Sequence, residues 1–332
     1  MGWTFFRTAG VLVMFALATS AAVPRLRVPA FLGTVRDCHP PFSVFMSASR
    51  TASASSSAVR KRSRTKIPTD PPQENWRQQM DGVRSMRRTK DAAVDFAGAG
   101  ALKDSSAGSD DDVRFQVLMS AMLSSQTKDP VTAAGVHRMR EACAPAPLGA
   151  AALLATGMDE DALAELLHPV SFKKTKASRD TYREAKHILM VCERLAKAEG
   201  GREAGAIPNT VKGLLDLPGV GPKMTYLVMD VGWGQNEGIC VDTHVHRISN
   251  RLGWVDTWSR GKSKAQNPEK TRKHLQGWLP REHWSEVNGL LVGFGQQVCF
   301  AINPSCGTCG IRELCPSAER HGDLSQPPNT TP

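Results

Sequence analysis

The sequence predicts an all-α protein, and two observations support this fold class. From Trp76 onward, apolar residues recur at the spacing of a helix face, and no segment shows the alternation typical of a strand. Asp129-Pro130 and Asn267-Pro268 are typical helix starts, because a capping residue is followed by a proline at the first helical position. The predicted helices cover residues 113–124, 130–142, 159–168, 181–198, 210–216, 222–232, 243–252, 268–278 and 281–299. Residues 94–112, rich in Gly, Ala, Ser and Asp, predict a surface loop.

The N-terminal segments predict targeting sequences rather than a folded core. Residues 1–36 contain four arginines and no acid, and their apolar run at 11–23 is too short to cross a bilayer. This pattern is typical of an organelle transit peptide or of a secretory-type signal. A Ser/Ala linker follows at 47–58, and the basic cluster at 59–66 indicates either nuclear import or a solvated tail.

We therefore expect a disordered targeting and basic tail over residues 1–75 and a second disordered tail over residues 319–332. The expected location is the nucleus and the mitochondrion, with a plastid, or a signal-type leader in a compound address, as the alternatives. The net charge of +10 favours a polyanionic partner, but residues 1–75 hold ten Lys/Arg against three acids. The folded part must therefore bind a polyanion through a local site. An aromatic content of 6% argues against a broad base-stacking platform.

Four of the eight cysteines fall within 17 residues, with the spacing C-x6-C-x2-C-x5-C. They are Cys299, Cys306, Cys309 and Cys315. A secreted disulfide framework would spread its cysteines along the chain, so a reducing compartment and one metal centre fit better. Four thiolates this close can hold zinc or a [4Fe–4S] cluster, and their spacing alone leaves the two open.

The stretch LPGVGPKM, residues 217–224, predicts a hairpin between two helices. Pro222 is suited to the first position of the second helix, and the glycines permit a tight turn. Unpaired N–H groups at such a turn can bind a phosphate without a positive side chain, whereas the plainer interpretation is an ordinary helix–helix turn. Lys223 is unexpected in the first helical turn, where the helix dipole disfavours a cation.

A second motif, VDTHVHRISNR, follows at residues 241–251. Asp242 precedes a predicted helix, so it is either a plain N-cap or a carboxylate that faces Lys223 across a cleft. His244 and His246 lie on different faces of that helix, which favours phosphate contact or surface placement over a zinc pair. Arg247 is expected to form a basic edge of the same helix together with the arginine four residues later.

These motifs, in this order and separation, resemble the endonuclease III family of helix–hairpin–helix DNA glycosylases that carry an iron–sulfur cluster. LLVGFGQQVC at 290–299 and LSSQTKD at 123–129 are similar to the eukaryotic branch of that family. The resemblance runs from about Trp76 to Pro316. It rests on the conjunction of the motifs rather than on any single one.

The resemblance implies a two-lobed, all-α helix–hairpin–helix glycosylase fold with DNA in the cleft between the lobes. A six-helix barrel lobe with the hairpin would cover residues 108–235, and an iron–sulfur cluster lobe would join 76–107 to 236–318. The implied activity is that of a bifunctional DNA glycosylase/AP lyase of base excision repair. Such an enzyme removes oxidised pyrimidines such as thymine glycol from duplex DNA and nicks the abasic strand. A monomer without membrane contact is expected.

The resemblance also implies residue roles. Lys223 matches the nucleophilic lysine of the family and Asp242 its catalytic aspartate. Gln126 matches the residue that fills the gap left by the flipped base, and the four clustered cysteines match the ligands of the [4Fe–4S] cluster. The remaining expected DNA contacts are Leu217, Gly219, Val220 and Gly221 of the hairpin, with His244 and Arg247 of the following helix.

The chain departs from the family in one place, since the segment between Phe172 and Ile188 is several residues longer than usual, which puts lesion preference in doubt. Other functions stay open on the residues, among them a specificity for UV dimers and a zinc-stapled binding module. A relative that removes adenine opposite an oxidised guanine would lack a lysine at 223 and carry a further C-terminal domain. A non-catalytic, cluster-bearing DNA sensor would have no need of Lys223 and Asp242 together.

Overall fold

The computed structural model describes residue 71 and residues 73–104, 108–170, 177–197, 204–258 and 266–318, with side chains from residue 183 onward in the third long segment. All regular structure in these segments is helical, so the predicted all-α class is confirmed. Except for a few residues after position 70, both predicted tails lie outside the described residues. The apolar run at 11–23 and part of the lengthened segment lie outside them as well.

The helices have the following bounds: α1 Trp76–Met86, α2 Ala93–Ala97, α3 Asp110–Leu123, α4 Asp129–Cys143, α5 Ala150–Ala155, α6 Glu160–Leu167, α7 Ala177–Ala196, α8 Val211–Leu215, α9 Pro222–Trp233, α10 Thr243–Arg251, α11 Pro268–Trp278 and α12 Trp284–Gln297, with short 3-10 turns η1 Arg281–His283, η2 Cys306–Thr308 and η3 Arg312–Leu314. Local sequence explains several of these limits. Asn267 caps α11 through a 3.0 Å hydrogen bond from Lys270 N, as its Asn-Pro start predicts. Gly234 ends α9 in the left-handed conformation.

The surface loop predicted for residues 94–112 is partly wrong. The short helix α2 forms there, and the side chain of Asp95 accepts a 2.8 Å hydrogen bond from Ala92 N at its start. Leu102, in the same stretch, is buried against the helices that follow. Small residues such as Ala and Gly gave no clear helical spacing, so the sequence pattern missed contacts that are made with distant segments.

Most of the described helices pack around two separate apolar cores. The first core is formed by α3–α9 with the loops between them, and the second core by α1, α10, α11, α12 and the cysteine-bearing segment after them. In the second core, Trp76 and Trp254 each contact Trp278 edge to face, with ring centroids 5.4 and 6.2 Å apart. These two cores do not test the domain boundaries expected from the sequence, which stay a prediction.

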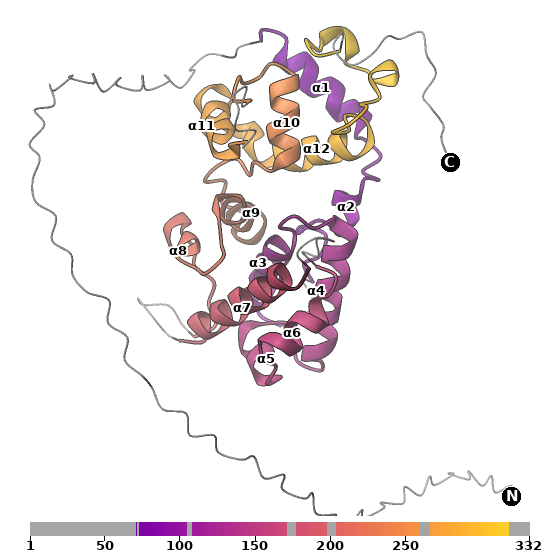
Figure 1. Cartoon of the computed structure of the whole chain (residues 1–332). Helices are drawn as coiled ribbons and strands as arrows, with labels where there is room; N and C mark the ends of the chain where they lie inside the picture. Colours follow the sequence, from indigo (N-terminus) through magenta and orange to yellow (C-terminus); the bar gives the residue numbers. More distant parts are fainter. Residues whose placement is uncertain are drawn as a thin grey trace, which may run out of the picture. The chain divides into compact units, whose positions relative to one another are not determined.

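Helix α2 packs on both α4 of the first core and α12 of the second, and Figure 1 shows it at the junction between the two groups of helices. Within the first core, α3 packs against α9, which brings the end of α3 beside the start of α9. No helix in the described segments is long and apolar enough to span a bilayer.

Candidate active site

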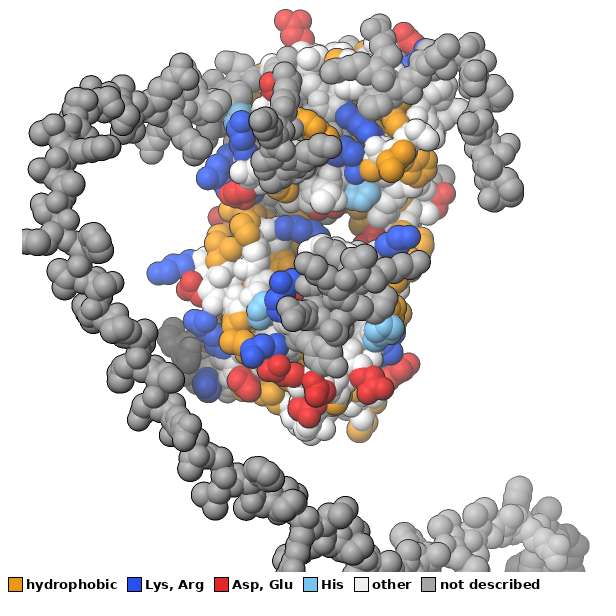
Figure 2. Space-filling model, viewed as in Figure 1, with side chains coloured by type: hydrophobic (Ala, Val, Ile, Leu, Met, Phe, Trp, Pro, Cys, Tyr) orange, Lys and Arg blue, Asp and Glu red, His pale blue; other side chains and the backbone are white. Residues whose placement is uncertain are grey.

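Both cores contribute to a cleft of about 1960 Å³. One wall comes from the end of α3 and the start of α9, and the other from the start of α10 and one face of α12. Figure 2 shows a hollow between the two groups of helices, with Lys and Arg side chains beside it. A cleft of this size accommodates a macromolecular substrate better than a small metabolite, whose pockets are several times smaller.

The hairpin predicted at 217–221 connects α8 to α9 on the first-core side of this cleft. Gly219 has a φ of +77°, and a Cβ atom there would lie 2.6 Å from Nδ1 of His187. This turn therefore requires glycine for its conformation and for the closeness of α7. Leu217 and Val220 are buried in the first core and anchor the turn.

The backbone amides of the hairpin are the part that remains open to a ligand. Val220 N donates to Leu217 O at 3.2 Å, so this amide is used inside the turn. Among the described residues, no acceptor pairs with the N–H groups of Gly219 and Gly221. Gly221 is the N-cap of α9, with open space where its Cβ would be. These two amides at a helix N-terminus suit an anion such as a phosphate.

Lys223 lies in the first turn of α9 and its side chain is half-buried in the cleft. Nζ donates a 3.1 Å hydrogen bond to Oγ of Ser124, which ends α3. The Ser124 hydroxyl donates in turn to the carbonyl of Ala121 at 2.8 Å. Because that proton is committed to Ala121, Ser124 faces the lysine as an acceptor, whether Nζ carries two protons or three. This contact gives the amine a hydrogen-bond acceptor at a helix start, where the helix dipole disfavours a cation.

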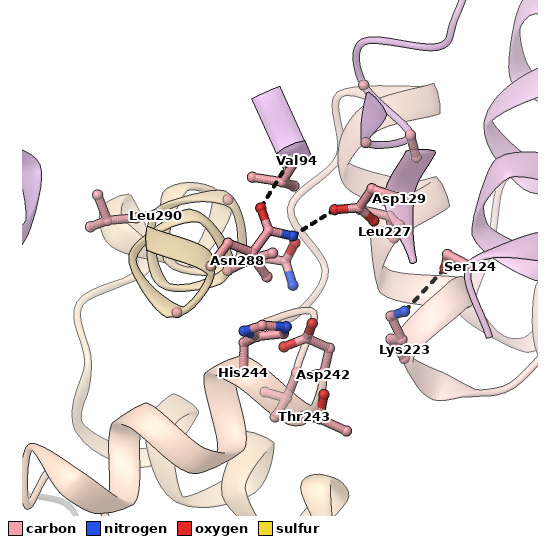
Figure 3. A pocket seen from close by; sticks show the side chains of 18 of the residues that line it. Val94, Ser124, Asp129, Lys223, Leu227, Asp242, Thr243, His244, Asn288 and Leu290 are labelled. Atoms are coloured by element: carbon pink, nitrogen blue, oxygen red, sulfur yellow. Dashed lines mark hydrogen bonds between the residues drawn. The ribbon is translucent and has the colours of Figure 1, made fainter. Parts of the chain in front are cut away.

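Asp242 caps α10, because Oδ1 accepts a 2.8 Å hydrogen bond from Val245 N. The capping interpretation is therefore correct, yet the same side chain also lines the cleft. Figure 3 shows Lys223 and Asp242 on two sides of one pocket. In the described structure they do not form an ion pair, since the lysine nitrogen is bound to Ser124. The fold thus brings Lys223 and Asp242 to one cleft, while each side chain hydrogen-bonds to another partner.

His244 also lines the cleft and is half-buried. Burial lowers its pKa, Arg247 and Lys223 add to this, and the carboxylates of Asp242 and Asp129 oppose it. Nη2 of Arg247 lies 3.2 Å from Nδ1 of His244. A guanidinium only donates, so Nδ1 accepts and the neutral ring carries its proton on Nε2.

Two expectations for the same helix are wrong. His246 is 3% exposed, with Nδ1 2.7 Å from Thr271 Oγ1 and Nε2 2.9 Å from Gln266 Oε1, so it is neither a surface group nor a phosphate ligand. Arg247 is 8% exposed and donates to Cys299 O at 2.9 Å. The expected basic edge is absent at Arg247, because its guanidinium satisfies carbonyls of the second core. Arg247 also lines the cleft, and its contact with DNA stays a prediction.

Gln126 is exposed in the loop between α3 and α4 and lines the cleft. Its φ is +56°, a left-handed conformation that costs a residue with a Cβ about 1–2 kcal/mol. Such a backbone at a cleft edge is typical of a residue that is held in place for a function.

The four clustered cysteines surround a second, small cavity of about 30 Å³ beside α12. Burial raises the pKa of Cys306, Cys309 and Cys315, and neighbouring thiols of the same set add to this effect. Nη1 of Arg251 donates to Sγ of Cys299 at 3.3 Å. The cavity thus has thiols around it and positive charge beside it.

Four thiols around one cavity can ligate a tetrahedral zinc ion or an iron–sulfur cluster. Arg251 and Arg312 at the edge of the cavity suit the negative charge of metal-bound thiolates.

Sequence reasoning missed Ser124, although it stands in the quoted motif LSSQTKD. It expected Asp129 to cap a helix, but Asp129 is the first residue of α4 and Lys128 stands at the N-cap position, so that expectation is wrong. It also missed the bond of Asp129 with Gln296, at 2.7 Å. The motifs contain these residues, but they do not show which residues pair. Hydrogen-bond partners separated by 99 and 167 residues can be identified only once the helices are packed.

Comparisons with known proteins place the chain in a known family. Residues 119–281 match the family model described as HhH-GPD superfamily base excision DNA repair protein. The chain is 47% identical over 254 residues to endonuclease III-like protein 1 of Mus musculus, covering 76% of each chain. It is 44% identical over 247 residues to endonuclease III homolog 1, chloroplastic, of Arabidopsis thaliana, covering 74% of this chain and 60% of that one.

A solved structure described as a non-covalent endonuclease III–DNA complex shares the fold. Its TM-score is 0.56 at 23% identity, and the match covers 74% of this chain and 96% of the other.

Proposed function

We propose, for a chain that belongs to the endonuclease III family, that Lys223 and Asp242 carry out base removal and strand nicking at oxidised pyrimidines in duplex DNA. The protein is a DNA glycosylase/AP lyase of base excision repair. Thymine glycol is the proposed representative substrate. The observation that carries the proposal is a lysine on the helix–hairpin–helix and an aspartate on the next helix lining one cleft.

DNA binding is assigned to groups that remain open at this cleft. The free amides of Gly219 and Gly221 suit a phosphate of the damaged strand, and the helix dipole of α9 adds to the attraction. Gln126, already held in a strained conformation at the cleft edge, is placed to occupy the gap in the duplex once the base is flipped out. His244 offers an Nε2–H donor beside Asp242.

The chemistry begins with Lys223 as a neutral amine. An N–H of Nζ donates to Ser124, so the nitrogen lone pair is left for the sugar carbon that bears the damaged base. As this carbon–nitrogen bond breaks, its electron pair leaves with the base, which takes up a proton. Positive charge develops on the sugar, and the Asp242 carboxylate stabilises it.

The second step follows from the first. The amine loses a proton, and we assign the Asp242 carboxylate as the base that accepts it. The sugar ring then opens to a Schiff base with Lys223. Loss of a C2′ proton then expels the 3′ phosphate by β-elimination, which nicks the strand. Water finally releases the lysine.

We propose that Cys299, Cys306, Cys309 and Cys315 hold a [4Fe–4S] cluster. When bound, the cluster supplies a cross-link that ties the chain after α12 back onto the second core. Arg251 supports this arrangement, because it also donates to the carbonyls of Phe300 and Ala301 in the loop between the first two cysteines.

The proposed organisation keeps the predicted lobes, with the six-helix barrel over 108–235 and the cluster lobe over 76–107 and 236–318. We propose a monomer, located in the nucleus and mitochondrion, with a plastid as the alternative. A relative named chloroplastic shows that members of this group differ in destination. Fusing residues 1–75 to a fluorescent protein tests the location directly.

A nicking assay on duplexes that each carry one defined lesion tests the function. Thymine glycol and an abasic site should be cut, and borohydride should convert the intermediate into a stable protein–DNA adduct. Cutting of adenine opposite oxidised guanine, with thymine glycol left intact, would assign the rival function instead.

A further inference from the structure

The two motifs quoted for the family branch, LSSQTKD and LLVGFGQQVC, meet in the structure through one side chain. Oε1 of Gln296 accepts a 3.0 Å hydrogen bond from Val94 N at the start of α2. Nε2 of the same amide donates to Oδ2 of Asp129 at 2.7 Å. Both the oxygen and the nitrogen of the amide are therefore hydrogen-bonded. Figure 3 draws the two bonds as dashed lines, one ending at Val94 and the other at Asp129.

The face of α12 around Gln296 is shaped to hold the neighbouring site residues. A Cβ at Gly295 would lie 2.5 Å from Nδ1 of His244, so the imidazole packs where that helix has no side chain. Next to Gln296, Gln297 accepts from Nη1 of Arg87 at 2.5 Å and donates to Asp91 at 2.6 Å. The end of α12 is thus fixed to the second core on one side and reaches Asp129 on the other.

The Gln296–Asp129 bond joins the two walls of the cleft that carry the proposed catalytic groups. On the first-core side, Asp129 follows the loop that begins at Ser124, which holds the amine of Lys223. On the second-core side, α12 contacts His244, two residues after Asp242. Asp129 adds a charge near His244, which places the bond at the cleft itself.

Two other hydrogen bonds that link the two groups of helices are more exposed. Ser285 donates to Asp230 at 2.7 Å and Arg281 to the carbonyl of Asn236 at 2.7 Å, both in exposed positions. Water competes with such bonds, whereas the Gln296–Asp129 bond is partly buried.

We propose that Gln296 is a positioning residue for catalysis, which through Asp129 holds the two cores in the register that sets Asp242 opposite Lys223. This inference rests on the proposed function of that pair. Its consequence is that base removal slows when residue 296 carries a negative charge facing Asp129.

The test is a charge-exchange cycle on the full chain. Gln296→Glu keeps an acceptor for Val94 N but sets a second carboxylate against Asp129. Asp129→Asn keeps an acceptor for Gln296. Combining the two lets the new amide of residue 129 donate to the new carboxylate of residue 296. Gln235→Glu, on an exposed side chain after α9, adds the same charge without touching the pair.

The measured quantities are the single-turnover rate of borohydride trapping on thymine-glycol DNA, the Kd for an uncleavable abasic analogue, and Tm. Gln296→Glu should slow trapping at least tenfold, about 1.4 kcal/mol at the barrier, with a smaller change in Kd. Gln235→Glu should stay within threefold of wild type, and Asp129→Asn gives the reference rate for the double variant. The double variant should return to the rate of Asp129→Asn. A merely structural role would lower Tm and the active fraction while leaving the trapping rate of the folded protein unchanged.

A wild-type rate for Gln296→Glu, or a double variant as slow as Gln296→Glu, overturns the inference. Should Gln296→Glu be insoluble, Asp129→Ala removes the acceptor instead and must slow trapping more than Asp129→Asn does. Absence of trapping by the wild-type protein would refute the proposed function itself, and so the two failures are distinguishable.

Discussion

The amine of Lys223 is bound to the hydroxyl of Ser124, 3.1 Å away, and not to the carboxylate of Asp242. The nucleophile and its acceptor belong to two helices of the same core, whereas Asp242 begins a helix of the other core. The amine is therefore oriented before DNA arrives, while the Asp242 carboxylate caps α10 and is not paired with the amine.

Ser124→Ala should slow Schiff-base formation about tenfold, because one hydrogen bond of roughly 1–1.5 kcal/mol orients the amine. Affinity for abasic-analogue DNA should change little. Ser124→Thr keeps the hydroxyl and should recover most of the rate. Single-turnover trapping rates and equilibrium binding, measured on the same preparations, separate the two effects. Equal trapping rates for the serine and alanine proteins would show that Ser124 does not orient the amine.

Asp242→Asn should abolish most base excision without destabilising the protein. Asparagine caps helices as well as aspartate does, so α10 should keep its start, while the charge that stabilises the developing cation is lost. We expect at least a hundredfold loss in excision of thymine glycol and a change in unfolding free energy below about 0.5 kcal/mol.

Asp159 supplies the matched control for that substitution, since it caps α6 in the same way, with Oδ1 accepting from Ala162 N at 2.9 Å. Asp159→Asn should leave excision unchanged. If Asp242→Asn retains full turnover, the carboxylate is only a cap.

Gly219→Ala should weaken both stability and DNA binding. Its φ of +77° disfavours alanine by about 1 kcal/mol, and the new Cβ would meet His187, so the turn must shift. Gly157 is the control, because its φ is +69° and nothing lies within 4 Å of a Cβ there. Gly157→Ala should cost only the conformational part and leave DNA affinity intact. Equal effects of the two substitutions on Kd, measured by fluorescence anisotropy, would argue against phosphate binding at the hairpin.

Local signals predicted the helix starts and the hairpin, since a cap, a proline and a glycine act within a few residues. Long-range packing decided the rest. Helix α2 could not be predicted, because its N–H at Val94 is satisfied by Gln296, 202 residues later. His246 was misplaced for the same reason, since the spacing of two histidines cannot show that Thr271 and Gln266 will enclose one of them.

Replacing Cys309 by alanine should remove the broad visible absorption of an iron–sulfur protein and lower Tm, because the loop after α12 loses its cross-link. Cys143→Ala is the control, since Cys143 is buried in the first core, away from the second cavity. That variant should keep the colour. A colourless wild-type protein that contains zinc would contradict the assignment to a [4Fe–4S] cluster.

The central claim is that Lys223 is the residue that forms the covalent bond with DNA. The most direct measurement is mass-spectrometric mapping of the peptide that carries the sugar after borohydride trapping on thymine-glycol DNA. The account predicts a single modified residue, Lys223, and no adduct in Lys223→Gln. An adduct on another lysine, such as Lys128 at the cleft or Lys212 on α8, or undiminished trapping in Lys223→Gln, would contradict it.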